Sequence, residues 1–345
     1  MVVSRIYVHG IGAATPAGWG MAALRDALAR NAPLPTNEIA RPGWTKPLRV
    51  RTVPRLTPPP AFLRNPRLRR SSPIAHFAMA AALEALGFTA ENIPPANPRL
   101  GIIFCVMAGC VNYSRRFYDE TLKDPSTASP LVFPETVFNA PMSHIGALLG
   151  ATAGHHTLVG DPGTVLQGLA LAADWLTTGA VDGCLVIGAE EMDWITADAV
   201  RLFNRNVILA EGAGAVYLRR EPAQTAAVRL SAVTDSHIFS NRQTREQAVL
   251  AARRELKSCG NGELLVGSRQ GLLGTDEAEK IAWADWQGEV SQPKHILGEG
   301  LAAAAAWQCV AAVDALRQNR YPAAVVSVVG TNQQAIAAEF YGNAR

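Results

Sequence analysis

The most promising place for a nucleophile is the start of a buried helix, which this sequence predicts at about Thr164 to Thr177. In an open parallel α/β sheet, ligands lie beyond the carboxyl ends of the strands, where the helices begin. A thiol at such a helix start would have a lowered pKa, and the free backbone amides there would stabilise an oxyanion. The segment at 154–164, GHHTLVGDPGT, contains neither cysteine nor serine. Asp161 is a good N-cap residue and Pro162 is accepted in a first helical turn, so the segment is typical of a structural helix start.

The spacing does not favour metal or disulfide chemistry either. His155 and His156 are adjacent on a predicted extended segment, so their side chains point in opposite directions. The five cysteines, at 105, 110, 184, 259 and 309, form no CxxC pair and lie in apolar or helical surroundings. We therefore expect free thiols, no metal site and no cofactor.

The elements that position the helix start occur twice along the chain. Apolar strands and helices alternate in the same order in both halves, as strand, helix, strand, helix, strand. In the first half these are residues 5–12, 73–86, 100–106, 164–177 and 183–188, and in the second half residues 227–233, 245–256, 263–266, 299–317 and 323–329. This alternation predicts parallel sheets that are covered on both faces. The fold class that follows is α/β, with duplicated βαβαβ halves packed as five layers, α/β/α/β/α.

The central helices of such a body would be buried on all sides. The unbroken alanine run Ala302–Ala306 suits this position, because small residues let a helix fit between two sheets. The length of 345 residues is sufficient for one large duplicated unit.

The composition excludes several classes of protein. Hydrophobic residues make up 48% and charged residues 18% of the chain, which excludes a disordered, collagenous or coiled-coil protein. A net charge of +3 is too small for a dedicated nucleic-acid surface. No apolar stretch is long enough to span a bilayer, and the N-terminus is typical of a strand rather than a signal peptide. We expect a cytoplasmic protein that binds neither nucleic acid nor membrane.

One basic cluster stands out, because Arg64, Arg67, Arg69 and Arg70 fall within seven residues. The cluster could receive an acidic partner, or it could be a solvated run of charge before a helix.

Five motifs in order give the chain a resemblance to the condensing enzymes of the thiolase fold, specifically the β-ketoacyl-acyl carrier protein synthases. Residues 8–18, VHGIGAATPAG, are similar to the family's V-x-G-x-G-x-x-T-P-x-G, and residues 133–139, FPETVFN, to its F-x-P-x-x-x-x-N interface segment. Residues 188–191, GAEE, and 209–215, LAEGAGA, resemble its G-G-A-E and G-E-G-A-G, and residues 330–332 its G-T-N. The resemblance covers nearly the whole chain and implies a thiolase-like fold.

The departures from the family are more informative than the matches. The family's catalytic triad is one cysteine, which carries the acyl chain, and two histidines, which assist decarboxylation of the malonyl extender. In this sequence the cysteine motif aligns with Pro162 or Gly163, the first histidine with Ser268, and the second with Glu299. Lys294, which belongs to the second histidine motif, is retained. The resemblance therefore implies that no catalytic residue remains.

Members of the family with this property are chain-length factors, which pair with an active ketosynthase subunit and limit the growing polyketide. The resemblance implies such a non-catalytic subunit in polyketide or fatty-acid-type biosynthesis, most like those of aryl polyene pigment clusters. It implies a first half at residues 1–220, with an interface and tunnel segment at about 105–145, and a second half at residues 221–345. Its partners would be the active ketosynthase and acyl carrier protein, the latter reached either directly or through the ketosynthase only.

The resemblance also implies roles for residues outside the degenerate triad. Pairing would use the strand Cys184–Gly188 as an edge, together with the segment Phe133–Asn139. Arg69 and Arg70 align with a basic pair that contacts acyl carrier protein in related synthases. An acyl tunnel at the interface would be lined by six side chains: Met107, Cys110, Tyr113, Phe117, Phe133 and Phe138. Four of them, at 107, 110, 113 and 117, have helical spacing and are expected to share one face, which could equally be core.

Two other functions stay open at this point. One is an acyl-transfer or hydrolytic enzyme with a replacement nucleophile, in which Ser268 would meet His155 or His156 in the fold. Against it, Glu299 would repel a developing oxyanion. The other is a homodimeric acyl-binding module with no ketosynthase partner.

Overall fold

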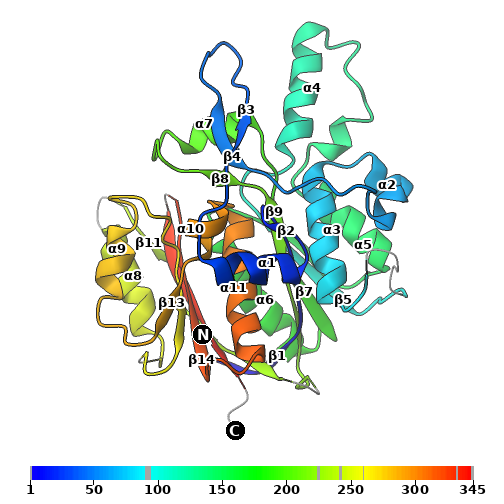
Figure 1. Cartoon of the computed structure of the whole chain (residues 1–345). Helices are drawn as coiled ribbons and strands as arrows, with labels where there is room; N and C mark the ends of the chain where they lie inside the picture. The colour runs from blue at the N-terminus through cyan, green and yellow to red at the C-terminus, as the bar shows by residue number, and fades with distance from the viewer. Residues whose placement is uncertain are drawn as a thin grey trace.

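The computed structural model describes residues 2–89, 95–223, 226–240, 243–258, 260–331 and 333–342 (Figure 1). Through them runs a 12-stranded sheet, whose main path has the order β13-β12-β14-β15-β10-β1-β9-β7-β5-β6. β1 and β10 pair antiparallel in the middle of this path and divide it into two parts. We name them the first half-sheet, which ends at β1, and the second half-sheet, which begins at β10.

The two half-sheets repeat one topology, which confirms the duplication expected from the sequence. The first consists of β1 (Val2–Thr15), β9 (Gly212–Arg219), β7 (Gly183–Glu190), β5 (Leu100–Val106) and β6 (His155–Val159). The second consists of β10 (Val228–Val233), β15 (Gln334–Tyr341), β14 (Ala323–Val329), β12 (Leu264–Val266) and β13 (Glu289–Ser291). Strand by strand, the order and the directions correspond.

The expectation of purely parallel sheets is wrong, because each half-sheet is mixed. β7, β5 and β6 pair parallel, as do β14, β12 and β13. β9 and β15, which the sequence analysis did not assign, run antiparallel to the strands on both of their sides. β15 follows β14 after a short connection, and only an antiparallel strand can follow so closely.

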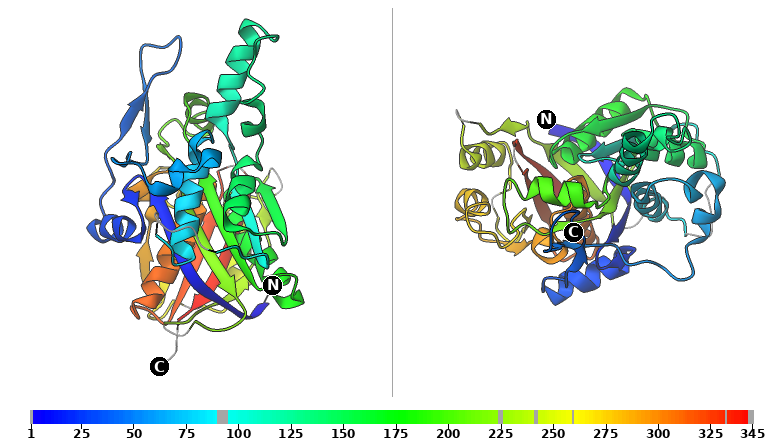
Figure 2. Two further views of the ribbon diagram at one scale, coloured as in Figure 1. Left: turned by 90° about the vertical axis from the view of Figure 1, so that its right-hand side faces the viewer. Right: turned by 90° about the horizontal axis from the view of Figure 1, so that it is seen from above.

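The layers are those expected from the sequence (Figure 2). α3 (Pro73–Ala85) and α5 (Ala140–Leu149) cover the outer face of the first half-sheet, while α8 (Arg245–Arg254) and α9 (Glu277–Ala282) cover that of the second. α6 (Thr164–Thr178) and α11 (Ala302–Arg317) lie between the half-sheets, within the largest apolar core. The fold is a five-layer α/β/α/β/α body.

Small residues on both sides let α11 pass through the centre. Every residue of α11 from Ala302 to Leu316 is buried. A β-carbon added at Gly188 of β7 would lie 2.4 Å from the carbonyl oxygen of Ala302, and one at Gly214 of β9 would lie 2.8 Å from the β-carbon of Ala306. The alanine run of α11 therefore packs against glycines of the first half-sheet. This confirms the expectation that small residues let the helix fit between two sheets.

Several elements lie outside these layers. α4 (Val111–Lys123) and the short helix η2 (Phe133–Glu135) form an arm that projects beyond the body in two views (Figures 1 and 2). β3 (Asn37–Ile39), β4 (Leu48–Arg51) and β8 (Leu209–Ala210) form a small second sheet beside α7 (Trp194–Val200). The remaining elements are β2 (Gly18–Trp19), α1 (Met21–Arg30), η1 (Ala61–Arg64), α2 (Pro66–Arg69), β11 (His237–Ile238) and α10 (Pro293–Leu297).

The strand expected to form an intermolecular edge does not lie at an edge. β7, which contains Cys184–Gly188, is buried along its whole length and pairs with β5 on one side and β9 on the other. A strand that is apolar on both faces belongs in the middle of a sheet. The first half-sheet ends instead at β6, where Val159 is 51% exposed.

Among the described residues, no helix combines the length and the apolar character that crossing a membrane would require.

Candidate functional site

The start of α6 has no room for a nucleophilic side chain. Gly163 is the N-cap residue of α6, and a β-carbon there would lie 2.8 Å from both the Gln334 amide nitrogen and a methyl group of Ile336. Pro162, the other position aligned with the cysteine, is buried and immediately precedes this glycine. β15 therefore occupies the space into which a thiol would project.

Asp161 does not cap α6 as expected from the sequence. Its carboxylate accepts hydrogen bonds from the backbone amides of Thr331 and Gln334, both at 3.1 Å. It thus fastens the start of α6 to the loop after β14. Burial raises the pKa of Asp161, because the charged form loses its hydration.

Ser268, at the first histidine position, is fully engaged by the surrounding structure. Its hydroxyl donates to the carbonyl oxygen of Ser327 at 2.9 Å and accepts from the amide of Val329 at 3.0 Å. The amide nitrogen of Gln308 lies 3.3 Å away from the same hydroxyl. These are bonds to the end of β14 and to α11, so Ser268 joins two elements of the core.

Beneath Ser268 lies a second buried carboxyl group, that of Glu279. It accepts from the backbone amide of Ser268, at 3.0 and 2.9 Å, and from the hydroxyl of Ser327 at 2.6 Å. Burial raises the pKa of Glu279 above its ordinary value. No imidazole is among the hydrogen-bond partners of Ser268 in the described part of the chain, and the group nearest to its amide is an acid.

Glu299, at the second histidine position, forms a buried ion pair with Lys294. The Lys294 Nζ lies 3.0 Å from Glu299 Oε2, and the two side chains are 0% and 2% exposed. The same carboxylate accepts from the side-chain amide of Gln270 at 2.7 Å and from the backbone amide of Leu301 at 2.8 Å. A carboxylate so placed occupies the amide at the start of α11, which a developing oxyanion would otherwise use.

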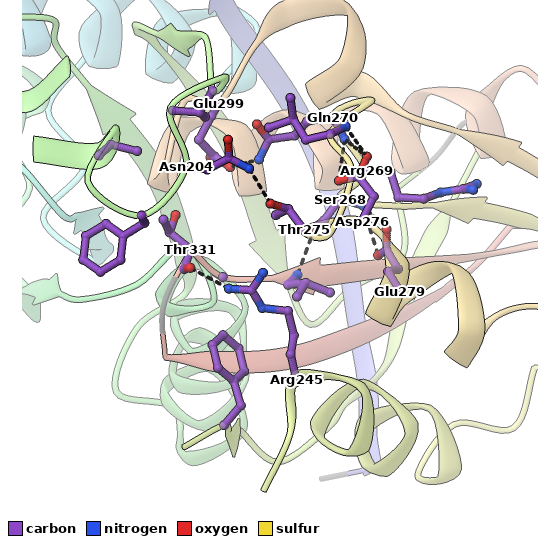
Figure 3. A pocket seen from close by; sticks show the side chains of 17 residues that line it. Asn204, Arg245, Ser268, Arg269, Gln270, Thr275, Asp276, Glu279, Glu299 and Thr331 are labelled. Atoms are coloured by element: carbon purple, nitrogen blue, oxygen red, sulfur yellow. Dashed lines mark hydrogen bonds between the residues drawn. The ribbon is translucent and has the colours of Figure 1, made fainter. Parts of the chain in front are cut away.

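Ser268 and Glu299 line one cavity, of about 360 Å³, between the ends of β12 and β14 and the loops beside them (Figure 3). The lining also includes Arg245, Thr331 and a wall of apolar side chains. Pro162 and Gly163 are not part of the lining. The structure therefore places two of the three aligned positions, Ser268 and Glu299, at one cavity, and the third position lies outside that cavity.

Arg245 lines this cavity although it was not predicted from the sequence. A signal was present, because Thr244 and Gln247 form a capping box that places Arg245 in the first turn of α8. A cation at that end of a helix opposes the helix dipole, and so calls for another explanation.

The cysteines give no substitute for the missing thiol. Cys105, Cys110, Cys184 and Cys309 are buried, and burial raises the pKa of each thiol. Cys259, and Asn332 of the G-T-N motif, lie outside the described residues.

The two adjacent histidines lie on β6, at the far edge of the first half-sheet. The ring of His156 packs on Trp175 at 5.4 Å, and His155 lies against Gly146 of α5. Neither is a hydrogen-bond partner of Ser268. Within the described ranges, no group of three or more His, Cys, Asp or Glu side chains could hold a metal ion.

The four residues expected to share one helical face, at 107, 110, 113 and 117, do not share one. Met107 and Cys110 precede α4, because Gly109 has a φ of +77°, and they pack into different clusters of the core. Only Tyr113 and Phe117 lie on α4 itself. The expectation of a common face from 107 to 117 is therefore wrong.

Contacts within the arm nevertheless bring some of the six together. The Phe117 and Phe133 rings lie 5.3 Å apart, and the Phe138 ring lies against Gly109. Tyr113 lines a surface groove of about 490 Å³ along α4. No residue of α4 is buried, whereas the exposed apolar side chains on and beside α4 and η2 are Tyr118, Leu122, Leu131, Phe133, Val137 and Phe138.

The basic cluster lies on and beside η1 and α2. Arg64, Arg67, Arg69 and Arg70 are all exposed, whereas Ser72, which follows them, is buried and donates to Glu191 at 2.5 Å. The arginines thus stand on a segment whose end is fixed to the body of the protein.

No protein-family model and no curated protein matches the chain. Solved structures do match over nearly its whole length. A chain of the ishigamide ketosynthase/chain length factor is 18% identical with a TM-score of 0.79, over 98% of this chain and 99% of that one. A β-ketoacyl synthase from Burkholderia phymatum is 15% identical with a TM-score of 0.77, over 100% of both chains. A chain of the ketosynthase ApeO in complex with its chain length factor ApeC, from Xenorhabdus doucetiae, is 14% identical with a TM-score of 0.76, over 98% of both.

These likenesses establish a thiolase-like ketosynthase fold, as the sequence motifs implied. Because they include a synthase as well as pairs of a ketosynthase with a chain length factor, the fold by itself does not distinguish the two functions. The residues at the catalytic positions must do so.

Proposed function

We propose that this chain is the non-catalytic subunit of a ketosynthase pair, a chain-length factor that acts beside an active β-ketoacyl synthase. The observation that carries the proposal is the buried Lys294–Glu299 pair at 3.0 Å, which closes the position of the second histidine. With Gly163 packed on β15 and Ser268 bonded to β14, none of the three positions holds a thiol or an imidazole.

The comparisons support the pairing without deciding it. Two of the similar structures are described as a ketosynthase with a chain length factor, and a further one, AntDE:AntF, as a type II acyl-carrier protein with its ketosynthase. On this basis we propose polyketide or fatty-acid-type biosynthesis in the cytoplasm, and aryl polyene synthesis as the branch. The two halves, 1–220 and 221–345, would act as one scaffold.

The partner surface that we propose consists of the β6 edge and the arm. An unpaired strand edge and a projecting apolar arm both favour association with another chain, because each exposes groups that a second subunit can cover. Phe133 and Leu131 of the arm are 56% and 72% exposed. Covering them would enclose Phe117, whose ring lies 5.3 Å from that of Phe133, so that the acyl tunnel, with Met107, Cys110, Tyr113 and Phe138, would form only in the complex.

Arg69 and Arg70 are proposed to receive the acidic carrier protein, unless the carrier protein reaches the pair through the ketosynthase alone. Both arginines are exposed, so they can act on a charged partner mainly through association rate and salt sensitivity.

The test is co-expression of the chain with a ketosynthase that retains its cysteine and two histidines. We expect a 1:1 complex in gel filtration that condenses malonyl units and, by intact mass, an acyl adduct on the ketosynthase only. The same assay on this chain alone should give neither adduct nor condensation. A stable acyl adduct on this chain would contradict the proposal. A chain that stays monomeric in gel filtration and forms no complex with the ketosynthase would argue against the pairing.

A further inference from the structure

The cavity described above contains a cation without a counter-ion. Arg245 projects from the first turn of α8 toward Thr331, to whose carbonyl oxygen its guanidinium donates one hydrogen bond at 2.8 Å (Figure 3). Its guanidinium lies 4.8 Å from the centre of the Phe239 ring. Among the described residues, no carboxylate lies within ion-pairing distance of Arg245.

The two acids nearest to this guanidinium are already engaged with backbone amides. Asp161 accepts from the amides of Thr331 and Gln334. Asp276 accepts from three consecutive amides, those of residues 270–272, at distances of 2.7 to 3.1 Å. Burial lowers the pKa of Arg245 in spite of these two acids. An arginine stays charged even so, and a half-buried charge without a partner is costly.

A second group in the same cavity also lacks a partner. The Thr331 hydroxyl is buried and makes no hydrogen bond within the described part of the chain. Both groups belong to the wall formed by α8 and the loop after β14, whereas Glu299 on the opposite wall is neutralised by Lys294. The polar capacity that remains on this wall is therefore one guanidinium and one hydroxyl, side by side.

The apolar part of the lining comes from Val200, Phe203, Val207, Phe239, Leu272 and Val329. Polar side chains, among them Asn204, Arg269 and Thr275, line the cavity as well. A cavity of about 360 Å³ that combines an apolar surface with convergent polar groups has the character of a small-molecule site. Guanidinium groups pair with carboxylates through two parallel hydrogen bonds, and a neighbouring hydroxyl can donate a third.

We infer that this cavity binds an aliphatic monocarboxylate of medium length, with its carboxylate on Arg245 and Thr331 and its chain against the apolar walls. This site lies wholly within the chain and does not depend on the proposed pairing. A carboxylate metabolite could thus bind to the subunit in the cavity that Ser268 and Glu299 line.

The test uses octanoate as the probe and isothermal titration of the full chain, alone or in its purified complex. We expect saturable binding of octanoate, and a loss of at least tenfold in affinity in R245M. The matched control is R254M, because Arg254 lies on the exposed side of the same helix, and it should bind as the parent does. T331V removes the unpaired hydroxyl alone and should weaken binding about three- to tenfold, which keeps the test decisive if R245M does not fold.

Two further ligands test whether binding needs both the carboxylate charge and the aliphatic chain. Octanol has the same chain without the charge and should bind at least tenfold more weakly than octanoate. Inorganic phosphate has the charge without the chain and should not compete. Equal binding of octanoate to the parent, R245M and T331V would overturn the inference, as would octanol that binds like octanoate, or phosphate that displaces it. Complex formation with a ketosynthase is measured separately, so failure here leaves the proposed function untouched.

Discussion

Removing one member of the Lys294–Glu299 pair should destabilise the chain far more than removing both. The Nζ–Oε2 distance is 3.0 Å and the side chains are 0% and 2% exposed, so water cannot solvate a charge left behind. Breaking such a pair typically costs about 3–5 kcal/mol, whereas replacing both partners by neutral groups of similar size is often close to neutral. We therefore expect K294M and E299Q each to lower the free energy of unfolding by about 3 kcal/mol or more, and the double variant by clearly less than their sum.

Urea unfolding followed by circular dichroism measures the three variants against the parent. The Arg99–Asp182 pair provides the control, since its side chains are 52% and 61% exposed. Exposed pairs contribute about 0–1 kcal/mol, so R99M should change little. Single variants that cost less than about 1 kcal/mol, or a double variant that equals the sum of the singles, would refute the reasoning that this pair is a closed structural unit.

Four other predictions follow from the structure. Burial raises the pKa of Glu190 to about 8, so between pH 4.5 and 8 the folded chain binds a proton that the unfolded chain has released. The free energy of unfolding should therefore fall as the pH rises from about 4.5 to 8. E190Q should make this dependence on pH smaller in thermal unfolding. F133D should abolish pairing in gel filtration, while L273D, the control at a still more exposed side chain (99% against 56%), should not. F117A should lengthen the products of the complex by mass spectrometry, and unchanged lengths would mean that Phe117 is only packing. R69E/R70E should slow carrier-dependent turnover at low salt and not at high salt, and an unchanged rate would leave docking to the partner.

The regular elements were accessible from the sequence because their patterns are local. Apolar strands such as Leu100–Val106 and Ala323–Val329, and helices such as Pro73–Ala85, occur where periodicity and caps predict them. β9 was missing from the expected order of strands because it is rich in glycine and alanine, and β15, which follows the G-T-N motif, was not assigned. β9 pairs with β1 and β7, which lie far from it along the chain, and no local pattern encodes such pairing, whereas β15 pairs locally with β14.

The edge of the sheet was misplaced for a related reason. The order of strands in a sheet depends on the crossover connections. A local pattern predicts that a segment is a strand, but it does not predict which strands pair with it. The apolar composition of β7 on both faces was the available signal for a central position, and the mixed composition of β6 was the signal for an edge. Likewise, the helical spacing from Met107 to Phe117 took no account of Gly109, whose φ of +77° interrupts the helical register on which the expected common face depended.

The three positions that align with the catalytic triad take part in contacts between the layers of the fold. A working site must keep polar groups unpaired and space open, which costs stability that the rest of the fold must supply. In this chain Ser268 spans from β12 to β14 and α11, Glu299 is neutralised by Lys294, and Gly163 lets β15 close on α6. Each change turns a reactive position into a contact between layers. Arg245 and Thr331 are the exception, because the same cavity leaves them unsatisfied. The monocarboxylate that we infer for this cavity would pair with both of these groups.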